Sequence, residues 1–265
     1  MYRIGFIGMG NMGSALLSGM LHSELVCREE VACRDATDEM TNRTAQKLGI
    51  HACGSNYDLA KNSELIVLTI KPQYYAEVIA EIADTVAEGQ TILTVAPGKT
   101  LAWVKEQFGK DVAIVRCMPN TPALVGEGCT AVCRNELVSD ETYAQVLKLL
   151  AACGEAHSLP EKQFDAFVGL CGSSPAYVYM FIEAMADAAV LEGIPRDQAY
   201  TFAAQTVLGS ARMVLDTGKH PGALKDAVCS PGGTTIEAVR VLEEEGFRAS
   251  VMHAVMAAAE KSRLM

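Results

Sequence analysis

The chain has 265 residues, of which 50% are hydrophobic and 20% are charged, and its formal net charge is −10. This composition is typical of a globular protein with a sizeable core, and the length is natural for two domains. The acidic balance gives no electrostatic basis for binding nucleic acid or an anionic membrane, so neither partner is expected.

The N-terminal region and the cysteines favour a cytoplasmic location. The apolar run Ile4–Ile7 leads directly into a glycine-rich turn, without the separate basic region and cleavage site of a signal peptide. Ala184–Leu191 is too short to span a bilayer. The nine cysteines lack CxxC spacing and zinc-type ligand pairs, so buried or half-buried reduced thiols and no metal are expected.

The first part of the chain alternates strand and helix patterns. Buried-type apolar runs predict strands at Ile4–Ile7, Val31–Cys33, Leu65–Ile70, Thr91–Val95 and Val112–Cys117, and Thr130–Cys133 is a candidate for a further strand. Helical patterns lie near Ala15–His22, Met40–Leu48, Tyr75–Val86, Leu101–Gln107 and Glu141–Ala152. The alternation predicts an α/β domain of Rossmann type with a doubly wound parallel sheet.

After Pro160 the pattern becomes helical throughout. The remaining residues are rich in Ala, Met, Glu and Val and contain no convincing strand, which predicts an all-α domain. Helices as apolar as these usually bury more than one face. A partner subunit is therefore expected to cover part of them.

A glycine-rich loop follows the first predicted strand. Gly8-Met9-Gly10-Asn11-Met12-Gly13 fits the pattern G-x-G-x-x-G and opens a helix, which is the context that a dinucleotide site requires. The first glycine permits the tight turn, the second lets the backbone approach a pyrophosphate, and the third lets helix and strand pack closely. The free amides at the helix N-terminus would bind the phosphates. The pattern predicts a nicotinamide dinucleotide cofactor.

The end of the second predicted strand carries two opposing signals. Asp35 favours the ribose hydroxyls of NAD, whereas Arg34 favours the extra phosphate of NADP. Asp35 has the alternative role of helping Thr37 or Asp38 to cap the next helix, and Arg34 that of a solvated surface residue. The sequence leaves the choice open.

A second glycine-rich segment precedes a helix in the C-terminal part. Ser230-Pro231-Gly232-Gly233-Thr234-Thr235 leads into Ile236–Glu245, and Thr234 and Glu237 have the spacing of a capping box. A helix N-terminus with hydroxyls would hold a carboxylate beside a polar ring atom. The alternative is an ordinary capped loop.

Three further segments have both a functional and a structural interpretation. Ser174-Pro175 is either a helix start with Ser174 as N-cap or a kink in a helix that begins near Glu161. Lys71-Pro72 and Met118–Pro122 follow predicted strands at the carboxyl edge of the sheet, where α/β proteins bind ligands. Both could equally be rigid turns.

Together, these motifs resemble the pyrroline-5-carboxylate reductase family across essentially the whole chain. They are Ile7–Gly13, Lys71-Pro72, Met118–Pro122, Gly172–Val178, His220–Asp226 and Cys229–Thr235, and the last is the most distinctive. The resemblance implies a Rossmann domain at residues 1–158 and a helical dimerisation and substrate domain at 159–265. It further implies reduction of 1-pyrroline-5-carboxylate to L-proline, the last step of proline biosynthesis, by a homodimer that in this family often assembles further into decamers.

The resemblance also assigns roles to residues. It implies NADPH, with NADH tolerated, on Ile7, Gly8, Met9, Gly10, Asn11, Met12, Gly13, Arg34, Asn56, Thr69, Ile70, Lys71, Pro72, Ala96 and Gly98. It places the substrate on Ser174, Ser230, Gly232, Gly233, Thr234 and Thr235, with the Thr235 hydroxyl on the ring nitrogen as the catalytic group. Two departures from the family pattern are Pro97, in place of a small residue, and Asp35, in place of a serine or threonine.

Two rival interpretations remain. A β-hydroxyacid dehydrogenase would carry a catalytic lysine in a glycine-rich helix after the Rossmann domain, and Gly169–Met180 contains no lysine. A non-catalytic dinucleotide sensor would share the fold without the activity, because fold alone does not fix function.

Overall fold

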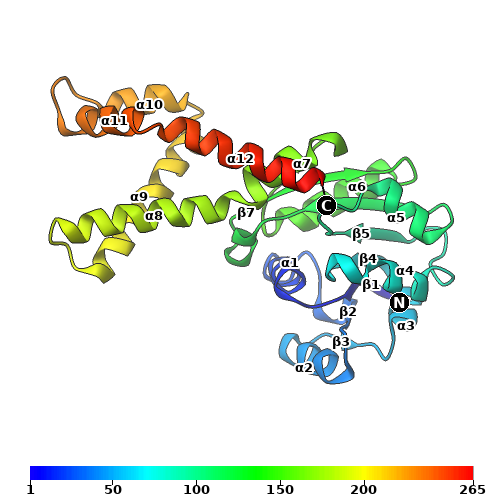
Figure 1. Ribbon diagram of the computed structural model, residues 1–265. Helices are drawn as coiled ribbons and strands as arrows, with labels where there is room; N and C mark the ends of the chain where they lie inside the picture. The colour runs from blue at the N-terminus through cyan, green and yellow to red at the C-terminus, as the bar shows by residue number, and fades with distance from the viewer. Residues whose placement is uncertain (265) are drawn as a thin grey trace. The chain divides into compact units, whose positions relative to one another are not determined.

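The computed structural model describes residues 1–264, which form two compact units (Figure 1). The first comprises Met1–Gly172 and the end of the last helix from Ala258 onward, and the second comprises Ser173–Ala257. By this division the helical turns after Pro160 belong to the first unit, where Phe164 is buried against Met118 and Cys133. The domain boundary between residues 158 and 159 stays a prediction.

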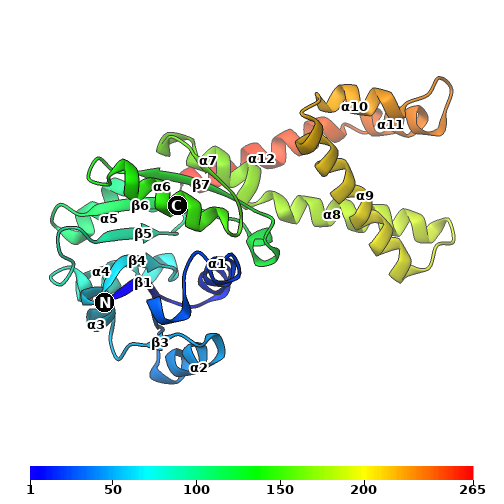
Figure 2. The ribbon, with the colours of Figure 1, turned by 180° about the vertical axis from the view of Figure 1, so that it is seen from behind.

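The first unit is built on an eight-stranded sheet (Figures 1 and 2). Its strands are β1 (Tyr2–Ile7), β2 (Val31–Arg34), β3 (His51–Ala52), β4 (Ser63–Leu68), β5 (Thr91–Thr94), β6 (Ala113–Met118), β7 (Gly128–Arg134) and β8 (Gly154–Ser158), in the order β3-β2-β1-β4-β5-β6-β7-β8. Neighbouring strands pair in parallel except β6 and β7, which are antiparallel. The predicted α/β sheet is confirmed, with one antiparallel junction that the sequence pattern did not indicate.

Each central strand sends alternate side chains to opposite faces of the sheet. In β4, Leu65 and Val67 join one hydrophobic cluster, whereas Ile66 and Leu68 join the other. This period of two follows from the pleat of the strand. Because both faces are covered, the strand is apolar along its length rather than alternating between polar and apolar residues.

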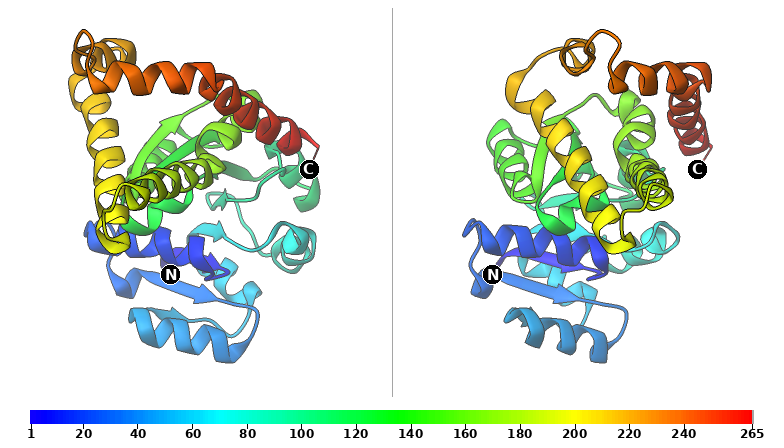
Figure 3. Two further views of the ribbon diagram at one scale, coloured as in Figure 1. Left: turned by 60° about the vertical axis from the view of Figure 1, so that its left-hand side comes forward. Right: turned by 90° about the vertical axis from the view of Figure 1, so that its left-hand side faces the viewer.

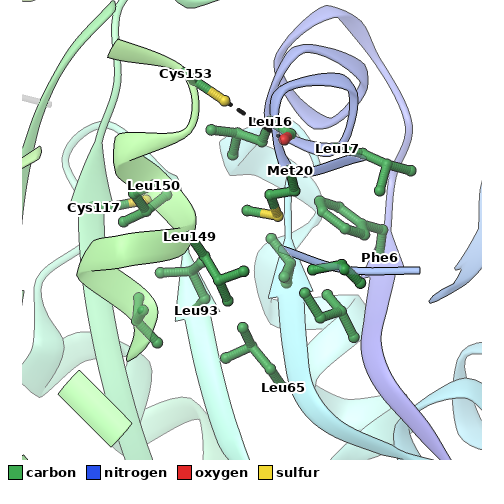
Figure 4. Packing of buried hydrophobic residues seen from close by; sticks show 14 of the residues in the cluster. Phe6, Leu16, Leu17, Met20, Leu65, Leu93, Cys117, Leu149, Leu150 and Cys153 are labelled. Atoms are coloured by element: carbon green, nitrogen blue, oxygen red, sulfur yellow. Dashed lines mark hydrogen bonds between the residues drawn. The ribbon is translucent and has the colours of Figure 1, made fainter. Parts of the chain in front are cut away.

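Helices cover both faces of this sheet. They are α1 (Asn11–His22), α2 (Asp38–Leu48), α3 (Asn56–Lys61), α4 (Tyr75–Ile82), α5 (Leu101–Phe108), α6 (Asp140–Ala151) and the single turn α7 (Phe164–Phe167). Figure 4 shows one cluster, in which Leu16, Leu17 and Met20 of α1 lie beside Leu149 and Leu150 of α6 over the strands. Full burial of a side chain such as leucine stabilises the fold by roughly 1.5–3 kcal/mol.

Local capping explains where several helices begin. The side chains of Thr37, Ser55, Thr100 and Ser139 each accept a hydrogen bond from a backbone amide in the first turn of α2, α3, α5 and α6, respectively. Such caps satisfy amides that have no partner within the helix. α2 then ends at Gly49, whose φ of 68° suits glycine.

The second unit is entirely helical, as predicted. It contains α8 (Ser174–Leu191), α9 (Arg196–Thr217), α10 (Pro221–Val228), α11 (Thr234–Glu244) and most of α12 (Phe247–Arg263), and Figure 3 shows α9 running from the end of α8 to α10. α8 and α9 pack through Ala186, Ala199 and Ala203, while the rings of Phe181 and Phe247 join α8 to α12 with centroids 6.0 Å apart.

Large apolar side chains remain exposed on these helices. Met180 is 69% exposed on α8, Leu215 is 77% exposed on α9, and Met256 is 63% exposed on α12. Contiguous apolar surface on a folded protein commonly marks an interaction site. The observation agrees with the expectation that a partner subunit covers part of this unit.

Candidate cofactor and substrate sites

The carboxyl ends of the central strands meet at one edge of the sheet. Ile7, near the end of β1, pairs in register with Arg34 of β2 and with Leu68 of β4, and Leu68 pairs with Thr94 of β5. The loops that follow these strands therefore start side by side. The fold thus brings the glycine loop, Arg34, Thr69–Pro72 and Ala96–Gly98 to the same edge, the expected ligand edge of an open α/β sheet.

The three loop glycines answer three different physical needs. Gly8 has a φ of +88°, in the left-handed region that favours glycine. At Gly13 an added Cβ would lie 2.7 Å from the carbonyl oxygen of Gly8 and 2.7 Å from Oγ1 of Thr69, so the close packing excludes a side chain. Gly10, by contrast, is the N-cap of α1, and an added Cβ there would meet no atom of the chain within 4 Å.

The open space at Gly10 fits a dinucleotide. A glycine that packing does not require leaves room for a group from outside the chain to approach the backbone. The first turn of α1 contains no acidic residue, so its positive end is not neutralised locally. Loop and helix therefore supply what a pyrophosphate needs: space, backbone donors and a favourable dipole.

Hydrogen bonds hold the loop in shape. Oγ1 of Thr69 donates to the carbonyl oxygen of Gly8 at 2.5 Å, and the amide of Gly8 donates to the carbonyl oxygen of Arg34 at 2.8 Å. The Ser14 hydroxyl donates to the carbonyl oxygen of Met9 at 3.2 Å. The loop is thus fixed by neighbouring residues and preorganised for a ligand.

The structure resolves part of the ambiguity at the end of β2. The Asp35 carboxylate accepts hydrogen bonds from the amides of Met9, at 3.3 Å, and Ala36, at 2.8 Å. Thr37 caps α2 instead, which removes the alternative role of Asp35 as a cap. The Arg34 guanidinium forms an ion pair with Asp38.

A cavity lies directly beside this ion pair. It is lined by Arg34, Asp38, Thr41, Asn42, Ala52, Cys53 and Gly54. Arg34 is the only cation and Asp38 the only anion among these residues. The cavity is at the end of β2, where the adenosine ribose of a dinucleotide lies in a Rossmann fold.

The remaining predicted cofactor residues have varied surroundings. Asn56, at the start of α3, donates through its side-chain amide to Glu81 of α4 at 2.6 Å. Lys71 is exposed and precedes the 3-10 turn Pro72–Tyr74. Ala96 is fully buried, so its methyl group faces the core, and Gly98 has a φ of +72°.

Tyr75 is a buried residue that supports this edge and that the sequence did not single out. Its hydroxyl donates to the carbonyl oxygen of Leu68 at 2.6 Å and accepts from the Val95 amide at 3.2 Å. It thereby joins the end of β4 to the end of β5. Burial raises the pKa of the phenol, so Tyr75 stays protonated and keeps its donor.

Asn120, in the predicted ligand-edge segment Met118–Pro122, has a bridging role that the sequence did not reveal. Its side chain accepts from the Cys129 amide at 2.9 Å and donates to the Cys171 carbonyl oxygen at 3.1 Å. The asparagine thus ties the start of β7 to the π-helical turn Val168–Gly172. In the sequence, only the two prolines of Pro119-Asn120-Thr121-Pro122 indicated a fixed conformation.

An ion pair with a buried arginine was also not predicted from the sequence. Arg116 of β6 is 4% exposed, and its Nη1 donates to Oε1 of Glu161 at 2.8 Å. The guanidinium lies 4.6 Å from the centre of the Phe164 ring, and Glu161 also accepts from the Leu101 amide at 2.7 Å. An arginine within an apolar strand gave no indication of its distant partner.

The second glycine-rich segment forms a turn that starts α11. The Gly233 amide donates to the carbonyl oxygen of Ser230 at 3.0 Å, and Gly232 has a φ of +68°. Ser230 and Thr234 are exposed, whereas Thr235 is half-buried. The segment therefore presents two glycines and three hydroxyls at the N-terminus of an eleven-residue helix.

The predicted capping box is wrong. Gly233, not Thr234, is the N-cap of α11, and no side chain caps the helix there. Thr234 is already helical, and Glu237 pairs with Arg240 at 2.6 Å instead of reaching back. Because the extended glycine takes the cap position, the side chains of Thr234 and Thr235 belong to the first turn.

The helix start near Pro175 is shifted by one residue. Ser173 is the N-cap of α8, Ser174 is its first residue and Pro175 its second, so the prediction of Ser174 as N-cap is wrong. Helical turns do begin at Glu161, as the alternative expected, with a 3-10 turn, α7 and the π turn, but they are interrupted at Ser173. Pro175 lacks the amide that a continuous helix would use.

The cysteines and the candidate metal ligands were predicted to form reduced thiols and no metal site. All nine cysteines are free thiols, of which five are buried and three are half-buried. Cys27 is exposed, so the expectation of buried or half-buried thiols is wrong for this residue. Within residues 1–264, no group of three or more His, Cys, Asp and Glu side chains is placed to hold a metal ion.

Hydropathy gives one more result for the described part of the chain. None of its helices combines the length and the apolar character that crossing a bilayer requires.

Comparisons with known proteins agree with these features. The sequence model for pyrroline-5-carboxylate reductase dimerisation matches residues 161–265, and that for NADP oxidoreductase, coenzyme F420-dependent, matches residues 3–98. The pyrroline-5-carboxylate reductase of Escherichia coli is 49% identical over 260 residues, covering 98% of this chain and 97% of the relative.

Solved structures show the same likeness. The Plasmodium falciparum pyrroline carboxylate reductase, solved with NADP bound, matches with a TM-score of 0.89 and 33% identity, covering 99% of this chain and 97% of the other. The Coxiella burnetii pyrroline-5-carboxylate reductase matches with a TM-score of 0.93 and 31% identity, with coverages of 99% and 97%. The chain therefore belongs to the pyrroline-5-carboxylate reductase family.

Proposed function

We propose that this protein reduces 1-pyrroline-5-carboxylate to L-proline with a hydride from NADPH, tolerating NADH, as the last step of proline biosynthesis. The observation that carries the proposal is family membership over the full chain, at 49% identity to a relative named for this reaction. The open, preorganised glycine loop adds a physical reason, because it fits the pyrophosphate of the cofactor.

The cofactor would lie along the carboxyl edge of the sheet. The loop from Gly8 to Gly13 would hold the pyrophosphate, and Arg34 and Asn56 would lie towards the adenosine end. Thr69–Pro72 and Ala96–Gly98 would line the edge beyond the loop. When bound, NADPH supplies the hydride; the chain supplies position and surroundings.

The substrate would be held by the turn before α11. Backbone amides of Gly232 and Thr234 would donate to the carboxylate, favoured by the positive end of the helix, while the Gly233 amide holds the turn by donating to Ser230. Ser174 and Ser230 would add hydroxyl contacts. The half-buried Thr235 hydroxyl would bond the ring nitrogen and orient the C=N bond.

The chemistry requires little acid–base assistance. A protonated C=N bond is electrophilic at carbon. The imine carbon, which becomes C5 of proline, accepts the hydride, and the ring nitrogen keeps its proton as the amine. Holding two reactants in register can itself supply much of the rate enhancement. This accounts for a site built from hydroxyls and amides rather than from histidine or acidic catalysts.

The assembly belongs to the same proposal. The C-terminal residues match a dimerisation family, and α8, α9 and α12 expose large apolar side chains. We infer a homodimer through the helical domain, with a decamer as the larger assembly. The cytoplasmic location stays a prediction.

The reaction is tested by following NADPH absorbance with purified protein and pyrroline-5-carboxylate. Oxidation that depends on the imine supports the proposal. Reduction of NADP⁺ when a hydroxyacid is supplied in place of the imine would instead favour the dehydrogenase interpretation. Cofactor binding without turnover of the imine would favour the sensor interpretation.

A further inference from the structure

An ion pair lies in the cavity at the end of β2. The Arg34 guanidinium pairs with Asp38 in the first turn of α2, and both side chains line the cavity. Arg34 is the only cation among the lining residues. Any anionic group that enters this cavity must therefore share Arg34 with Asp38.

We propose that Asp38 determines cofactor specificity by competing with the 2′-phosphate of NADPH for Arg34, which narrows the preference for NADPH over NADH. The inference rests on the proposed function to the extent that the adenosine end of the cofactor lies in this cavity. It adds a residue that the glycine-loop pattern does not address, because Asp38 lies four positions beyond the strand end.

Asp35 has a different and more rigid position. Its carboxylate accepts from the amides of Met9 and Ala36, and its own amide donates to Oγ1 of Thr41 at 3.0 Å. These contacts turn the carboxylate towards the glycine loop, where a ribose hydroxyl could donate to it. Asp35 therefore favours the binding of NADH, and it leaves the Arg34 guanidinium free to pair with Asp38.

The exposure of the pair makes the competition reversible. The Asp38 side chain is 80% exposed and that of Arg34 is 17% exposed, so water screens the carboxylate more than the guanidinium. Exposed ion pairs are weak. A phosphate carries more charge and more acceptor oxygens and matches a guanidinium well, so it displaces Asp38 at a small cost.

The two cofactors therefore leave the pair in different states. NADPH opens the Arg34–Asp38 pair and gains a guanidinium contact at its phosphate, whereas NADH leaves the pair closed. Removing Asp38 should then help only the phosphorylated cofactor. Glu39, in the same first turn of α2 but outside the cavity lining, provides a matched acidic control.

The test measures binding of 2′,5′-ADP and 5′-AMP by calorimetry to the full chain and to Asp38→Asn, Arg34→Gln, the double variant and Glu39→Gln. Asp38→Asn should tighten 2′,5′-ADP about two- to fivefold and leave 5′-AMP unchanged. Arg34→Gln should weaken 2′,5′-ADP on the order of tenfold. In the Arg34→Gln background, Asp38→Asn should bring no gain.

Several outcomes would overturn the inference. These are an equal gain for both ligands, a gain that persists without Arg34, or the same gain from Glu39→Gln, which would indicate general electrostatics instead. If neither 2′,5′-ADP nor 5′-AMP bound, the premise that the adenosine end of the cofactor lies in this cavity would be wrong, and the inference would fall with it. The proposed reaction would fall only if imine-dependent NADPH oxidation were absent as well.

Discussion

The hydroxyl of Thr69 donates a hydrogen bond to the carbonyl oxygen of Gly8 at 2.5 Å and so ties the turn after β4 to the turn after β1. Thr69 Oγ1 also lies at the position that makes Gly13 intolerant of a side chain. One side chain thus fixes both ends of the glycine loop, so its hydroxyl should matter for cofactor binding.

Replacing Thr69 by valine should weaken NADPH binding about fivefold, because the loop loses a hydrogen bond worth about 1 kcal/mol in its bound conformation. Thr69→Ser keeps the hydroxyl and should bind close to wild type. Calorimetric titration with NADPH compares the two. Equal affinity in both variants would remove the positioning role of the hydroxyl.

Gly10 and Gly13 should respond oppositely to alanine. At Gly10 the added methyl meets no atom of the chain, so Gly10→Ala should change the free energy of unfolding by less than about 0.5 kcal/mol. It should nevertheless weaken NADPH on the order of tenfold or more, because the methyl enters the space for the pyrophosphate.

Gly13→Ala is the matched contrast. Its methyl would meet the Gly8 carbonyl oxygen and Thr69 at 2.7 Å, so the apo-protein itself should lose about 1–3 kcal/mol. Urea unfolding without cofactor separates the two variants. A strongly destabilised Gly10→Ala with normal cofactor affinity would contradict the assignment of Gly10 to the ligand.

Thr235→Ala should lower kcat/KM for the imine about a hundredfold, because the hydroxyl that orients the ring nitrogen is lost. NADPH affinity should stay near wild type, since Thr235 lies in the helical unit rather than in the glycine loop. Thr235→Ser should restore most of the activity. Unchanged turnover in the alanine variant would end the assignment of Thr235.

Stability should fall at high pH. Burial in β2, with smaller contributions from Cys53 and Asp35, raises the pKa of the Cys33 thiol from 9.0 to about 11. Below about pH 9 the thiol is protonated in both the folded and unfolded states, and the stabilisation is fully present. As the pH rises from 9.0 towards about 11, the unfolded chain ionises first and the stabilisation is lost.

Urea unfolding at several pH values measures this loss. Between about pH 9 and 11, Cys33 should contribute a decline of at most about 1.4 kcal/mol per pH unit. Cys33→Ala should show a shallower slope, whatever its stability at neutral pH. Parallel slopes for the two proteins would show that this thiol does not titrate on unfolding in that range.

The sequence predicted the elements that bury much apolar surface. Ile66 and Leu68 lie in an apolar run that is typical of a strand covered on both faces, and β4 spans Ser63–Leu68 where a strand was predicted at residues 65–70. β8, with the sequence Gly-Glu-Ala-His-Ser, and the two-residue β3 carry no such pattern. They join the sheet through pairing with existing strands, which is a tertiary effect.

The candidate site divides in the same way. The glycine loop was predictable because its G-x-G-x-x-G pattern directly follows a strand and opens a helix, although the close contact of Gly13 with Thr69 is a tertiary one. The contacts of Asp35 with Met9 and of Asn120 with Cys171 span 26 and 51 residues, respectively, so no local pattern could reveal them. The capping-box prediction for Thr234 failed because the preceding glycine could take the cap position equally well.

Hydride transfer itself is tested most directly with deuterated cofactor. The protein would be incubated with pyrroline-5-carboxylate and NADPH carrying deuterium on either face at C4, and the product analysed by mass spectrometry and NMR. We expect L-proline with one deuterium at C5 from one of the two labelled cofactors. Absence of proline, or proline that carries no deuterium with either labelled cofactor, would contradict direct reduction of the imine by this protein.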